Sequence, residues 1–464
     1  MRIKAMDLVD RDIEQLYNKV SHFDRLVTDS RMVQSGDVFL AIRGERFDGN
    51  AFVAMALEKG ARLAICSEAP SSVPPEDPRL ALVEDTLITL QALARHHRSQ
   101  LSACTVIAIT GSNGKTTTRH LAAALLSQKF KTYATPGNKN NHIGLPLSIL
   151  QIKPGHEVAV IELGANHPGE NALLAGIAQP QHGLITNTGK DHLEGFGDEE
   201  GVIRANLELY DYLAQSGGKV WVDQHQPRLV EEAKARGLKA VYYGQGEEMG
   251  EERLVSASVV QRFPTLGVRL HLPEEKAITV QTRLFGDFHL QNILAATAMA
   301  ISMGISTTQI QNALSNFRAA DNRTQLIPLG PGGLLILDAY NANPSSMQMA
   351  VQSFADMPRE GTPKWIILGD MHELGQHEAP EHQQLVHMLQ MRATCFDRIL
   401  LVGERFARLR RSGPVFLPSL EALENYLQAH KTQWRRAKVL VKGSRSMALE
   451  RAFTEVMPKP NQQA

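Results

Sequence analysis

Short apolar runs alternate with longer amphipathic stretches along the first half of the chain. Residues 105–110 (TVIAIT) are apolar throughout, as in a strand buried on both faces. The predicted strands are residues 38–42, 62–66, 105–110, 157–162, 182–186 and 219–223. The predicted helices are residues 51–59, 87–98 and 115–128. Because strands and helices alternate, we predict a mainly parallel sheet covered by helices.

The second half of the chain changes pattern twice. Residues 252–283 alternate as antiparallel strands do, and a helix is predicted at 289–303. From residue 334 onward, the runs LLILDAY, KWIILGD, RILLVG and KVLVKG each precede a helical pattern. They predict a Rossmann-like domain that starts near Asn322 and lacks the GxGxxG fingerprint, so the fold alone implies no dinucleotide.

The pattern therefore predicts an α/β protein of three domains. We expect a small N-terminal α/β domain at residues 1–100, a central domain with a parallel sheet at 101–321, and a C-terminal Rossmann-like domain at 322–464. A chain of 464 residues is too long for one ordinary hydrophobic core, which agrees with this division.

Composition narrows the function classes. Lys and Arg total 49, as do Asp and Glu, so no net charge favours nucleic acid or an anionic membrane. The N-terminus lacks the apolar core of a signal peptide, and no apolar run approaches the roughly 20 residues needed to cross a bilayer. Cys66, Cys104 and Cys395 form no CxxC pair, which indicates reduced thiols. We expect a cytoplasmic protein that binds no nucleic acid and does not insert into membranes.

The strongest chemical signal is the segment 110–117 (TGSNGKTT) between a predicted strand and helix. Glycines let the backbone approach phosphates, and a helix N-terminus presents N–H groups to them. Lys115 is expected to contact the β- and γ-phosphates, and the Thr116 hydroxyl to contact Mg²⁺. The GxxGKT spacing is shorter than GxxxxGK[ST], because Ile109 stands at the place of the first glycine. The residues predicted to bind nucleotide here are Gly111, Ser112, Asn113, Gly114, Lys115, Thr116 and Thr117.

Two further side chains follow buried strands of the same predicted sheet. Glu162 ends the strand 157–162, and His192 lies in the segment 187–197 after the next strand. The carboxyl ends of parallel strands line the crevice where ligands bind, and Mg²⁺ prefers hard oxygen ligands. Lys115, Glu162 and His192 are therefore predicted to share one ligand-binding edge, although a strand-end carboxylate can also be merely solvated.

Three other segments could contribute to the site. Asn292, at the start of a predicted helix, could bond a purine edge; capping of that helix by His289 or a neighbour is the alternative. Residues 338–344 (DAYNANP) and 442–445 (KGSR) end strands of the third predicted domain. Each could be an exposed turn, but together they indicate a ligand-facing sheet edge.

Taken together, these motifs resemble those of the Mur ligase family, whose members build the peptide stem of the bacterial cell wall. The resemblance covers nearly the whole chain and several motifs in order. The matching segments are 28–31 (TDSR), 44–48 (GERFD), 137–144 (GNKNNHIG), 161–167 (IELGANH), 192–197 (HLEGFG), 338–344 (DAYNANP) and 441–446 (VKGSRS).

The resemblance implies an ATP- and Mg²⁺-dependent ligase with a UDP-binding N-terminal domain. Such an enzyme converts a carboxylate into an acyl phosphate, which an amine then attacks. The resemblance implies that the substrates are UDP-N-acetylmuramoyl-tripeptide and D-alanyl-D-alanine, both small molecules, and we expect a monomer. The sequence NANP at 341–344 argues against the member that adds a diamino acid.

The resemblance also assigns roles to residues. Lys115 and Thr116 would bind phosphate and metal, and Glu162 and His192 would be metal ligands. Asn292 and Arg323 would contact adenosine, and Asp338 would hold the ribose or help close the site. The residues implied in substrate binding are Ser30, Arg31, Asn138, Asn141, Tyr340, Asn341, Asn343 and Lys442.

One position departs from the family pattern. The family usually carries a carbamylated lysine on the helix after the His192 loop, and Asn206 stands at that catalytic position. Asparagine has no amine to carbamylate. The second metal site could therefore be weaker, Glu208 or Lys190 could compensate, or the chain could be a paralogue of changed activity. Arg204 nearby would not restore the chemistry.

Two other functions compete with this interpretation. Folylpolyglutamate synthase would place its phosphate loop near the start of the chain, whereas about 100 residues precede it here. A non-catalytic nucleotide-binding protein is supported only by Asn206. Formation of ADP that depends on an acceptor amine would exclude it.

Overall fold

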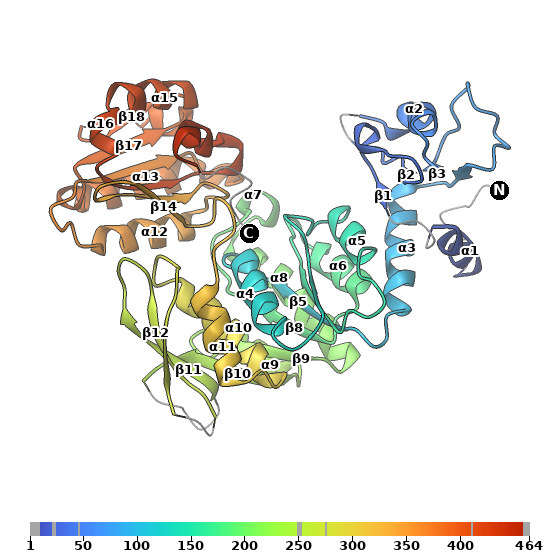
Figure 1. Ribbon diagram of the computed structural model, residues 1–464, viewed down its shortest axis with the longest axis horizontal. Coiled ribbons are helices and arrows are strands. Elements are labelled where there is room, and N and C mark those ends of the chain that lie inside the picture. Colours follow the sequence, from blue (N-terminus) through green and yellow to red (C-terminus); the bar gives the residue numbers. More distant parts are fainter. Residues whose placement is uncertain are drawn as a thin grey trace. The chain divides into compact units, whose positions relative to one another are not determined.

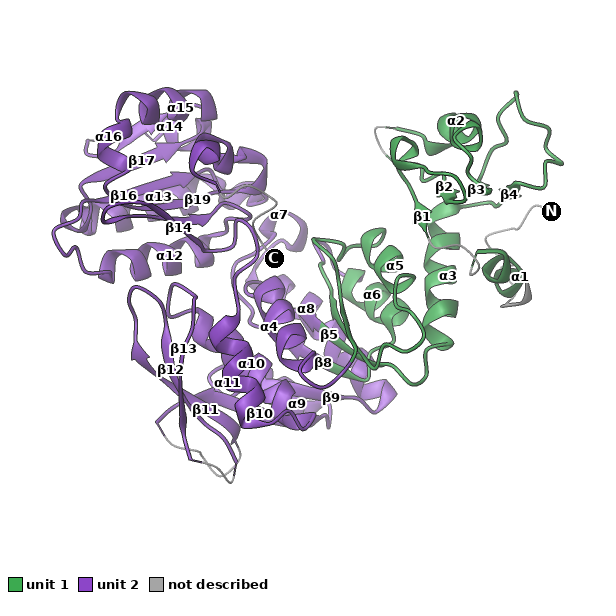
Figure 2. Cartoon of the chain, in the orientation of Figure 1, with its two compact units in different colours: residues 1–108, 131–164, 170–182 green, residues 109–130, 165–169, 183–464 purple. Residues whose placement is uncertain are grey.

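The computed structural model describes residues 10–20, 25–44, 47–247, 253–273, 276–409 and 412–457 (Figure 1). Two residues of the 44–48 motif, Glu45 and Arg46, lie outside this part of the chain. The chain divides into two compact units (Figure 2). Unit 1 comprises residues 1–108, 131–164 and 170–182, and unit 2 comprises residues 109–130, 165–169 and 183–464.

Unit 1 begins with a four-stranded parallel sheet of order β1-β2-β3-β4. Its central strands β2 and β3 are buried along their whole length, which explains their continuous apolar runs. The strands of unit 1 are β1 (Leu26–Val27), β2 (Val38–Leu40), β3 (Leu63–Cys66), β4 (Leu80–Leu82), β6 (Thr132–Ala134) and β7 (Val158–Glu162). Its helices are α1 (Asp10–Val20), α2 (Val53–Glu58), α3 (Thr86–Ser99), α5 (Gly144–Ile149) and α6 (Glu170–Ala178).

A second sheet has the hydrogen-bonded strand order β13-β12-β11-β10-β9-β8-β5-β7-β6. Strands β9, β10 and β11 pair in parallel, whereas β11, β12 and β13 pair antiparallel, as predicted for residues 252–283. The strands not yet given are β5 (Thr105–Thr110), β8 (His182–Ile185), β9 (Lys219–Asp223), β10 (Lys239–Gln245), β11 (Arg253–Gln261), β12 (Gly267–His271) and β13 (Ile278–Gln281).

Helices follow most strands of this central region in unit 2. Helix α10 is buried over most of its length and packs against α4. Such an all-round apolar helix belongs to the interior of a larger domain. The helices here are α4 (Lys115–Leu126), α7 (Leu193–Phe196), α8 (Glu199–Ser216), α9 (Pro227–Ala235), α10 (His289–Ser302) and α11 (Thr307–Asn316).

The C-terminal sheet has the order β14-β15-β19-β16-β17-β18, and only the pair β14–β15 is antiparallel. The strands are β14 (Gln325–Gly330), β15 (Gly333–Asp338), β16 (Lys364–Gly369), β17 (Arg398–Val402), β18 (Val415–Leu417) and β19 (Lys438–Lys442). The helices are α12 (Pro344–Asp356), α13 (Glu378–Met391), α14 (Glu404–Ala407), α15 (Leu420–Ala429) and α16 (Lys431–Trp434).

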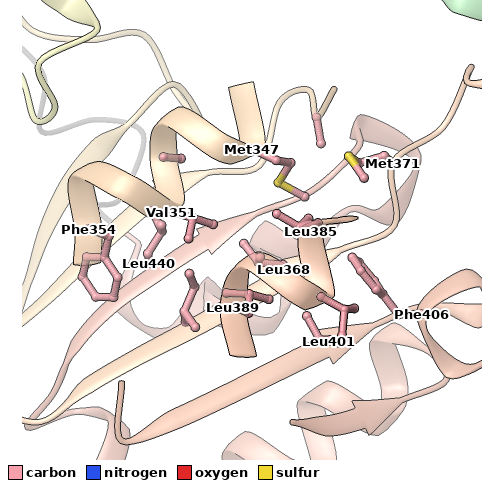
Figure 3. Close-up of a cluster of buried hydrophobic side chains, with 14 of the residues drawn as sticks. Met347, Val351, Phe354, Leu368, Met371, Leu385, Leu389, Leu401, Phe406 and Leu440 are labelled. Carbon is pink, nitrogen blue, oxygen red and sulfur yellow. The ribbon is translucent and has the colours of Figure 1, made fainter. Parts of the chain in front are cut away.

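Both faces of this sheet are buried. Successive strand residues such as Ile366 and Ile367 belong to different apolar clusters, because side chains alternate between the faces. Figure 3 shows one face, where Met347, Val351 and Phe354 of α12 pack over the strands. The remaining short helical segments are η2 (Ser30–Met32), η3 (Gly49–Phe52), η4 (Gly375–His377), η5 (Ala393–Cys395), η6 (Arg445–Met447) and η7 (Leu449–Val456).

The predicted fold class is confirmed as three-domain α/β, although the domain boundaries stay a prediction. The 51–59 helix begins later than predicted, because residues 49–52 form the tighter segment η3, whose first turn Asp48 caps. Every helix in the described part of the chain is too short or too polar to span a lipid bilayer.

Candidate active site

The phosphate-loop signal lies at the junction of β5 and α4 in unit 2. Strand β5 ends at Thr110 and helix α4 begins at Lys115, with Gly114 at the N-cap. Gly111 and Gly114 have positive φ angles of 127° and 83°, and no side chain caps the helix. The helix therefore begins with backbone N–H groups that can donate hydrogen bonds to a phosphate.

Neighbouring side chains leave no room for a Cβ atom on either glycine. A Cβ atom on Gly114 would lie 2.3 Å from Asn292 Oδ1, and one on Gly111 would lie 2.2 Å from Thr186 Oγ1. Asn292 also accepts a hydrogen bond from Thr118 Oγ1 at 3.1 Å. Asn292 thus supports the start of α4. Capping of α10 by His289 is not observed, because the N-cap residue is Phe288 and no side chain bonds there.

Lys115 points back into the loop. Its Nζ donates hydrogen bonds to the carbonyl oxygens of Gly111 and Ser112, and lies 3.8 Å from Asp191 Oδ2. Two loop residues bond Asn187 in the segment after β8. Asn187 Oδ1 accepts the N–H of Asn113 at 3.0 Å, and the Asn187 carbonyl oxygen accepts the N–H of Ser112 at 2.9 Å. The loop conformation is thus fixed by protein contacts around a lysine ammonium, and Thr117 is half-buried beside it.

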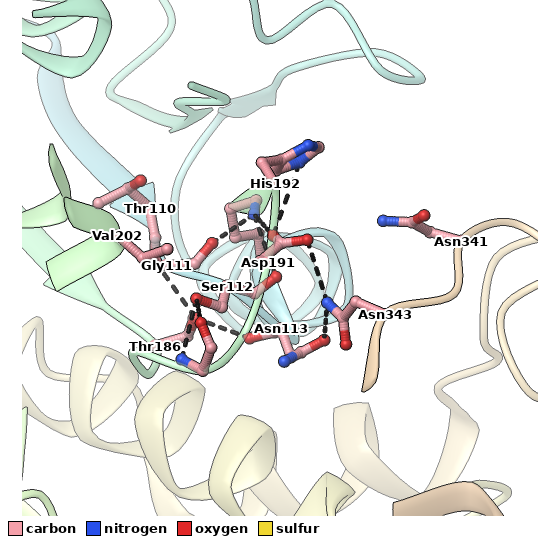
Figure 4. Close-up of polar contacts among 12 residues, drawn as sticks. Thr110, Gly111, Ser112, Asn113, Thr186, Asp191, His192, Val202, Asn341 and Asn343 are labelled. Atoms are coloured by element: carbon pink, nitrogen blue, oxygen red, sulfur yellow. Dashed lines mark hydrogen bonds and ion pairs between the residues drawn. The ribbon is translucent and has the colours of Figure 1, made fainter. Parts of the chain in front are cut away.

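Asp191 is a site residue that the sequence analysis did not single out. Its buried carboxylate contacts Lys115, accepts a hydrogen bond from Asn343 Nδ2 at 3.1 Å, and lies 3.6 Å from His192 Nε2 (Figure 4). Asn343 also donates to Asn113 Oδ1 at 2.9 Å. The available signal was its place directly before His192 in a segment that follows a buried strand.

His192 has a left-handed backbone, with φ of 46°. Its Nδ1 lies 2.6 Å from Glu373 Oε2, and its Nε2 faces Asp191. Burial opposes protonation of the imidazole, but the hydrogen bond to Glu373 and the charge of Asp191 outweigh it and raise the pKa of His192. Glu373, which follows β16, was also missed; its sequence signal was an acidic side chain shortly after a buried strand.

Arg323 brings a second cation to the start of α4. Its Nη2 donates a hydrogen bond to Thr116 Oγ1 at 3.0 Å, and its guanidinium carbon lies 3.7 Å from the ring centroid of Tyr340. Stacking of this kind holds a guanidinium plane in one orientation. The predicted residues Thr116, Arg323 and Tyr340 are therefore brought together.

Asp338 and Lys442 are register neighbours on β15 and β19. Lys442 Nζ is buried and bonds Asp338 Oδ2 at 2.7 Å and the Asn341 carbonyl oxygen at 2.9 Å. The Asn341 side chain accepts the N–H of Ala342. These three predicted residues form one polar group at the carboxyl edge of the C-terminal sheet.

Asn206 is buried, and both ends of its amide have protein partners. Its Oδ1 accepts a hydrogen bond from Thr110 Oγ1 at 2.9 Å, and its Nδ2 donates to the Val202 carbonyl oxygen at 2.9 Å. The two side chains named as substitutes bond elsewhere. Lys190 Nζ pairs with Glu381 at 2.7 Å, and Glu208 Oε1 accepts the N–H of Gly169 at 2.6 Å.

In unit 1, Glu162 ends β7 and is buried. Its Oε1 accepts a hydrogen bond from Asn140 Nδ2 at 2.8 Å, a partner that the sequence analysis did not name. Asn138 is exposed, and the Asn141 side chain accepts the N–H of Gly144 at the start of α5, so it supports local structure.

The predicted uridine-binding residues lie in η2 of unit 1. Ser30 is buried and its carbonyl oxygen accepts a hydrogen bond from Lys59 Nζ at 3.0 Å. The Arg31 side chain is 84% exposed and bonds the carboxylate of Asp29. Arg31 is thus accessible to a ligand, and the hydrogen bonds from Arg31 lower the pKa of Asp29 to about 2.

The described residues contain no ready-made cluster of three or more His, Cys, Asp or Glu side chains for a metal. Such a cluster is not required for Mg²⁺, which takes one or two protein ligands and completes its shell with phosphate oxygens and water. The Thr116 hydroxyl and the Nε2 side of His192 are donors of the kind that such a site uses. The glycine cradle and Lys115 fit a polyphosphate.

A phosphate-binding loop beside a histidine with acidic neighbours, in an α/β chain with a further Rossmann-like domain, indicates a nucleotide-using enzyme. Three family models match the sequence: "Mur ligase family, catalytic domain" over residues 22–100, "Mur ligase middle domain" over 109–300, and "Mur ligase, glutamate ligase domain" over 322–450. The chain belongs to the Mur ligase family.

Its relatives include the UDP-N-acetylmuramoyl-tripeptide–D-alanyl-D-alanine ligase of Escherichia coli, which is 33% identical over 92% of each chain. The enzyme of that name from Bacillus subtilis is 31% identical over 94% of this chain and 93% of its own. A crystal structure of MurF from Acinetobacter baumannii matches with a TM-score of 0.81 and 33% identity, covering 94% of this chain and 93% of that one. MurF ligase from Thermotoga maritima, solved in complex with ADP, matches with a TM-score of 0.80 and 27% identity over 93% and 96%.

Proposed function

We propose that this chain is the ATP-dependent ligase that joins UDP-N-acetylmuramoyl-tripeptide to D-alanyl-D-alanine. The observation that carries the proposal is the surroundings of Lys115, where a phosphate loop, Asp191, His192 and Arg323 meet at the start of α4. The names of the relatives, which span nearly the whole chain, supply the two substrates. The same proposal includes a cytoplasmic, monomeric enzyme.

The reaction needs a carboxylate to become a better electrophile. A carboxylate oxygen of the tripeptide attacks the γ-phosphorus of ATP, and ADP leaves with the electrons of the broken bond. The amine of D-alanyl-D-alanine then attacks the acyl carbon. Phosphate leaves with the electrons of the broken C–O bond, and the nitrogen gives up one proton to solvent as the amide forms. Phosphoryl transfer depends mainly on positioning and charge stabilisation.

The residues of unit 2 match these needs. The glycine cradle and the first turn of α4 bind the phosphates. Lys115 moves away from the loop carbonyl oxygens and neutralises negative charge on the phosphates. Arg323, held by Tyr340, adds a second positive charge at Thr116. Asn292 keeps the loop in shape through Gly114. Lys442 and Asp338 hold the carboxyl edge of the C-terminal sheet, and Asn343 is bonded to Asp191 and Asn113 beside it. We propose that Asn341 orients a ligand there.

Mg²⁺, when bound, would neutralise phosphate charge and orient the transferring group. We propose Thr116 and His192 of unit 2 as protein ligands of this ion. For Glu162 of unit 1, the metal-binding role stays a prediction. Ser30, Arg31, Asn138 and Asn141 remain proposed contacts of the UDP-linked substrate, and each can be tested by substitution.

The first test measures phosphate release from ATP and Mg²⁺ with UDP-N-acetylmuramoyl-tripeptide, with and without D-alanyl-D-alanine. The tripeptide is supplied in two forms, ending in lysine or in diaminopimelate. Release that needs both substrates and is lost in Lys115→Ala supports the ligase. The matched control is Lys234→Ala, which removes an exposed lysine from α9. ATP binding without phosphate release, with either tripeptide, would favour a non-catalytic paralogue. Phosphate release that needs glutamate would favour a folylpolyglutamate synthase.

A further inference from the structure

His192 and Glu373 form a short charged contact between two segments far apart in the sequence of unit 2. His192 Nδ1 lies 2.6 Å from Glu373 Oε2. His192 follows β8 of the central sheet, whereas Glu373 follows β16 of the C-terminal sheet. The pair thus joins the segment after one sheet to the segment after the other.

Both residues have the left-handed backbone that non-glycine residues normally avoid. The φ angle is 46° at His192 and 61° at Glu373. This conformation is unfavourable for a residue with a Cβ atom, so it persists only where the surroundings enforce it, and it is common at functional sites. Strain at both partners of one contact indicates that the fold is built to make that contact.

Backbone contacts around the pair hold the two segments together. The N–H of Glu194 donates to the Glu373 carbonyl oxygen at 3.2 Å. Gly375 has φ of 52°, and a Cβ there would lie only 3.2 Å from Glu194 Cα. His377 Nε2 lies 3.4 Å from the Gly197 carbonyl oxygen. The Glu373 carboxylate is therefore positioned by several contacts besides its own with the imidazole.

The contact determines which nitrogen of His192 is available. A neutral imidazole carries one N–H, and a carboxylate 2.6 Å from Nδ1 accepts that hydrogen. The lone pair then lies on Nε2, on the side of Asp191 and Lys115. Metal-binding histidines commonly donate their other N–H to a carboxylate, which fixes the tautomer and the ring orientation.

We propose that Glu373 is a positioning residue that holds His192 with Nε2 free to bind a divalent cation. Docking of the C-terminal segment on the central one is thereby coupled to cation binding. The inference rests on the proposed role of His192 in the ligase reaction, and it assigns Glu373 a role that acts through His192.

The test measures binding of Mn²⁺ in the presence of a non-hydrolysable ATP analogue, from the free Mn²⁺ signal in electron paramagnetic resonance. Glu373→Gly removes the carboxylate but suits the positive φ, because glycine adopts it freely. We expect its Mn²⁺ affinity to fall by about 10-fold or more, the usual effect of losing such a carboxylate. Its unfolding midpoint should be unchanged or higher.

Two further variants serve as controls. Glu373→Gln keeps an acceptor oxygen and should retain more Mn²⁺ affinity than Glu373→Gly. Glu194→Ala removes an exposed carboxylate nearby and should bind Mn²⁺ as the parent protein does.

A second measurement reads the tautomer directly. In protein labelled with ¹⁵N-histidine, the His192 signals are those that disappear in His192→Ala. They should show a protonated Nδ1 in the parent protein and a loss of this preference in Glu373→Gly. An unchanged tautomer would overturn the positioning role.

The outcomes separate the two proposals. If His192→Ala weakens Mn²⁺ binding but Glu373→Gly does not, the positioning role is wrong and the proposed function stands. If His192→Ala leaves Mn²⁺ binding unchanged, the metal role of His192 in the proposed function is wrong. If Mn²⁺ affinity in the Glu373 variants merely follows a fall in their unfolding midpoints, the residue is structural only.

Discussion

At the scale of single residues, Asn206 is held by Thr110 and Val202, and its amide is part of the packing between β5 and α8. Because it carries no amine, it cannot form a carbamate. Lys190 and Glu208, the two possible substitutes, bond Glu381 and Gly169 instead. The geometry therefore favours a ligase site in which no carbamate is used.

We predict that activity does not depend on dissolved CO₂. Phosphate release should be equal in CO₂-depleted buffer and in buffer with added bicarbonate, because the position at 206 offers an amide. Asn206→Lys is the matched variant: where it retains activity, that activity should rise with bicarbonate. The prediction is wrong if the parent protein loses activity when CO₂ is removed. If Lys190→Met no longer responds to CO₂ in that case, Lys190 carries the carbamate.

His289 should make stability depend on pH. Burial lowers the pKa of His289 to about 4, and the charge of Asp338 offsets this only in part. The unfolded chain takes up this proton below about pH 6.5, whereas the folded chain does not, so stability falls as pH falls through this window. Between about pH 7.5 and pH 5, the loss should be on the order of 2 kcal/mol.

Urea unfolding at both pH values checks this dependence. His289→Gln should lose less stability on acidification than the parent protein, because it has no proton to exclude. His387→Gln, which replaces an exposed histidine on α13, should behave as the parent does. Equal losses in the parent and His289→Gln would contradict the assignment.

At the scale of elements, the start of α4 depends on a glycine that no other residue can replace. Gly114→Ala combines a φ of 83° with a Cβ placed 2.3 Å from Asn292 Oδ1. We predict a loss of about 1–3 kcal/mol in unfolding free energy, with weakened ADP binding, since the helix start or Asn292 must shift. Gly217→Ala is the control, with φ of 71° and nothing within 4 Å. Gly217→Ala should lose stability only through backbone strain and should bind ADP with the parent's affinity. If both alanine variants weaken ADP binding equally, the steric contact with Asn292 is not the cause.

Element types could be predicted because burial repeats at a regular period. The strand at 105–110 is β5, and the helix at 115–128 is α4, which ends two residues earlier. Strands β1, β4, β6 and β18 were missed, since they have only two or three residues and no pattern can form over so short a length. Strands β10 and β14 were also missed, although they have seven and six residues. The parallel pairing of β10 with β11 depends on tertiary packing and could not be read from alternation alone.

Candidate site residues were predictable where they follow a buried strand. That rule selected Lys115, Glu162 and His192. Asp191 and Glu373 also follow buried strands, but the rule does not say which polar residue of such a segment reaches the site. Their contacts with His192 depend on the left-handed backbone at His192 and Glu373 and, for Glu373, on packing between segments distant in sequence. Conversely, Asn141 was selected by motif, yet its side chain supports the start of α5.

At the scale of the whole molecule, a charged contact connects the segment after β8 with helix α13 of the C-terminal part of unit 2. Lys190 Nζ lies 2.7 Å from Glu381 Oε1, and the hydrogen bond to Glu381 raises the pKa of Lys190. The Glu381 side chain is only 8% exposed, and within the described part of the chain its Oε2 has no hydrogen-bond partner. Such a carboxylate relies strongly on its one cation.

We therefore predict that Lys190→Met destabilises the protein by about 1–3 kcal/mol, below the full cost of a buried unpaired charge because Lys190 itself is one-third exposed. Lys190→Met combined with Glu381→Leu should recover much of that loss, since no charge is then left buried. Guanidinium unfolding of both single variants and the double variant measures the coupling. Lys431→Met, which breaks an exposed pair with Glu455 of similar length, should have a much smaller effect. If the two single losses add in the double variant, the pair does not couple these segments, and the contact between His192 and Glu373 would have to hold them together.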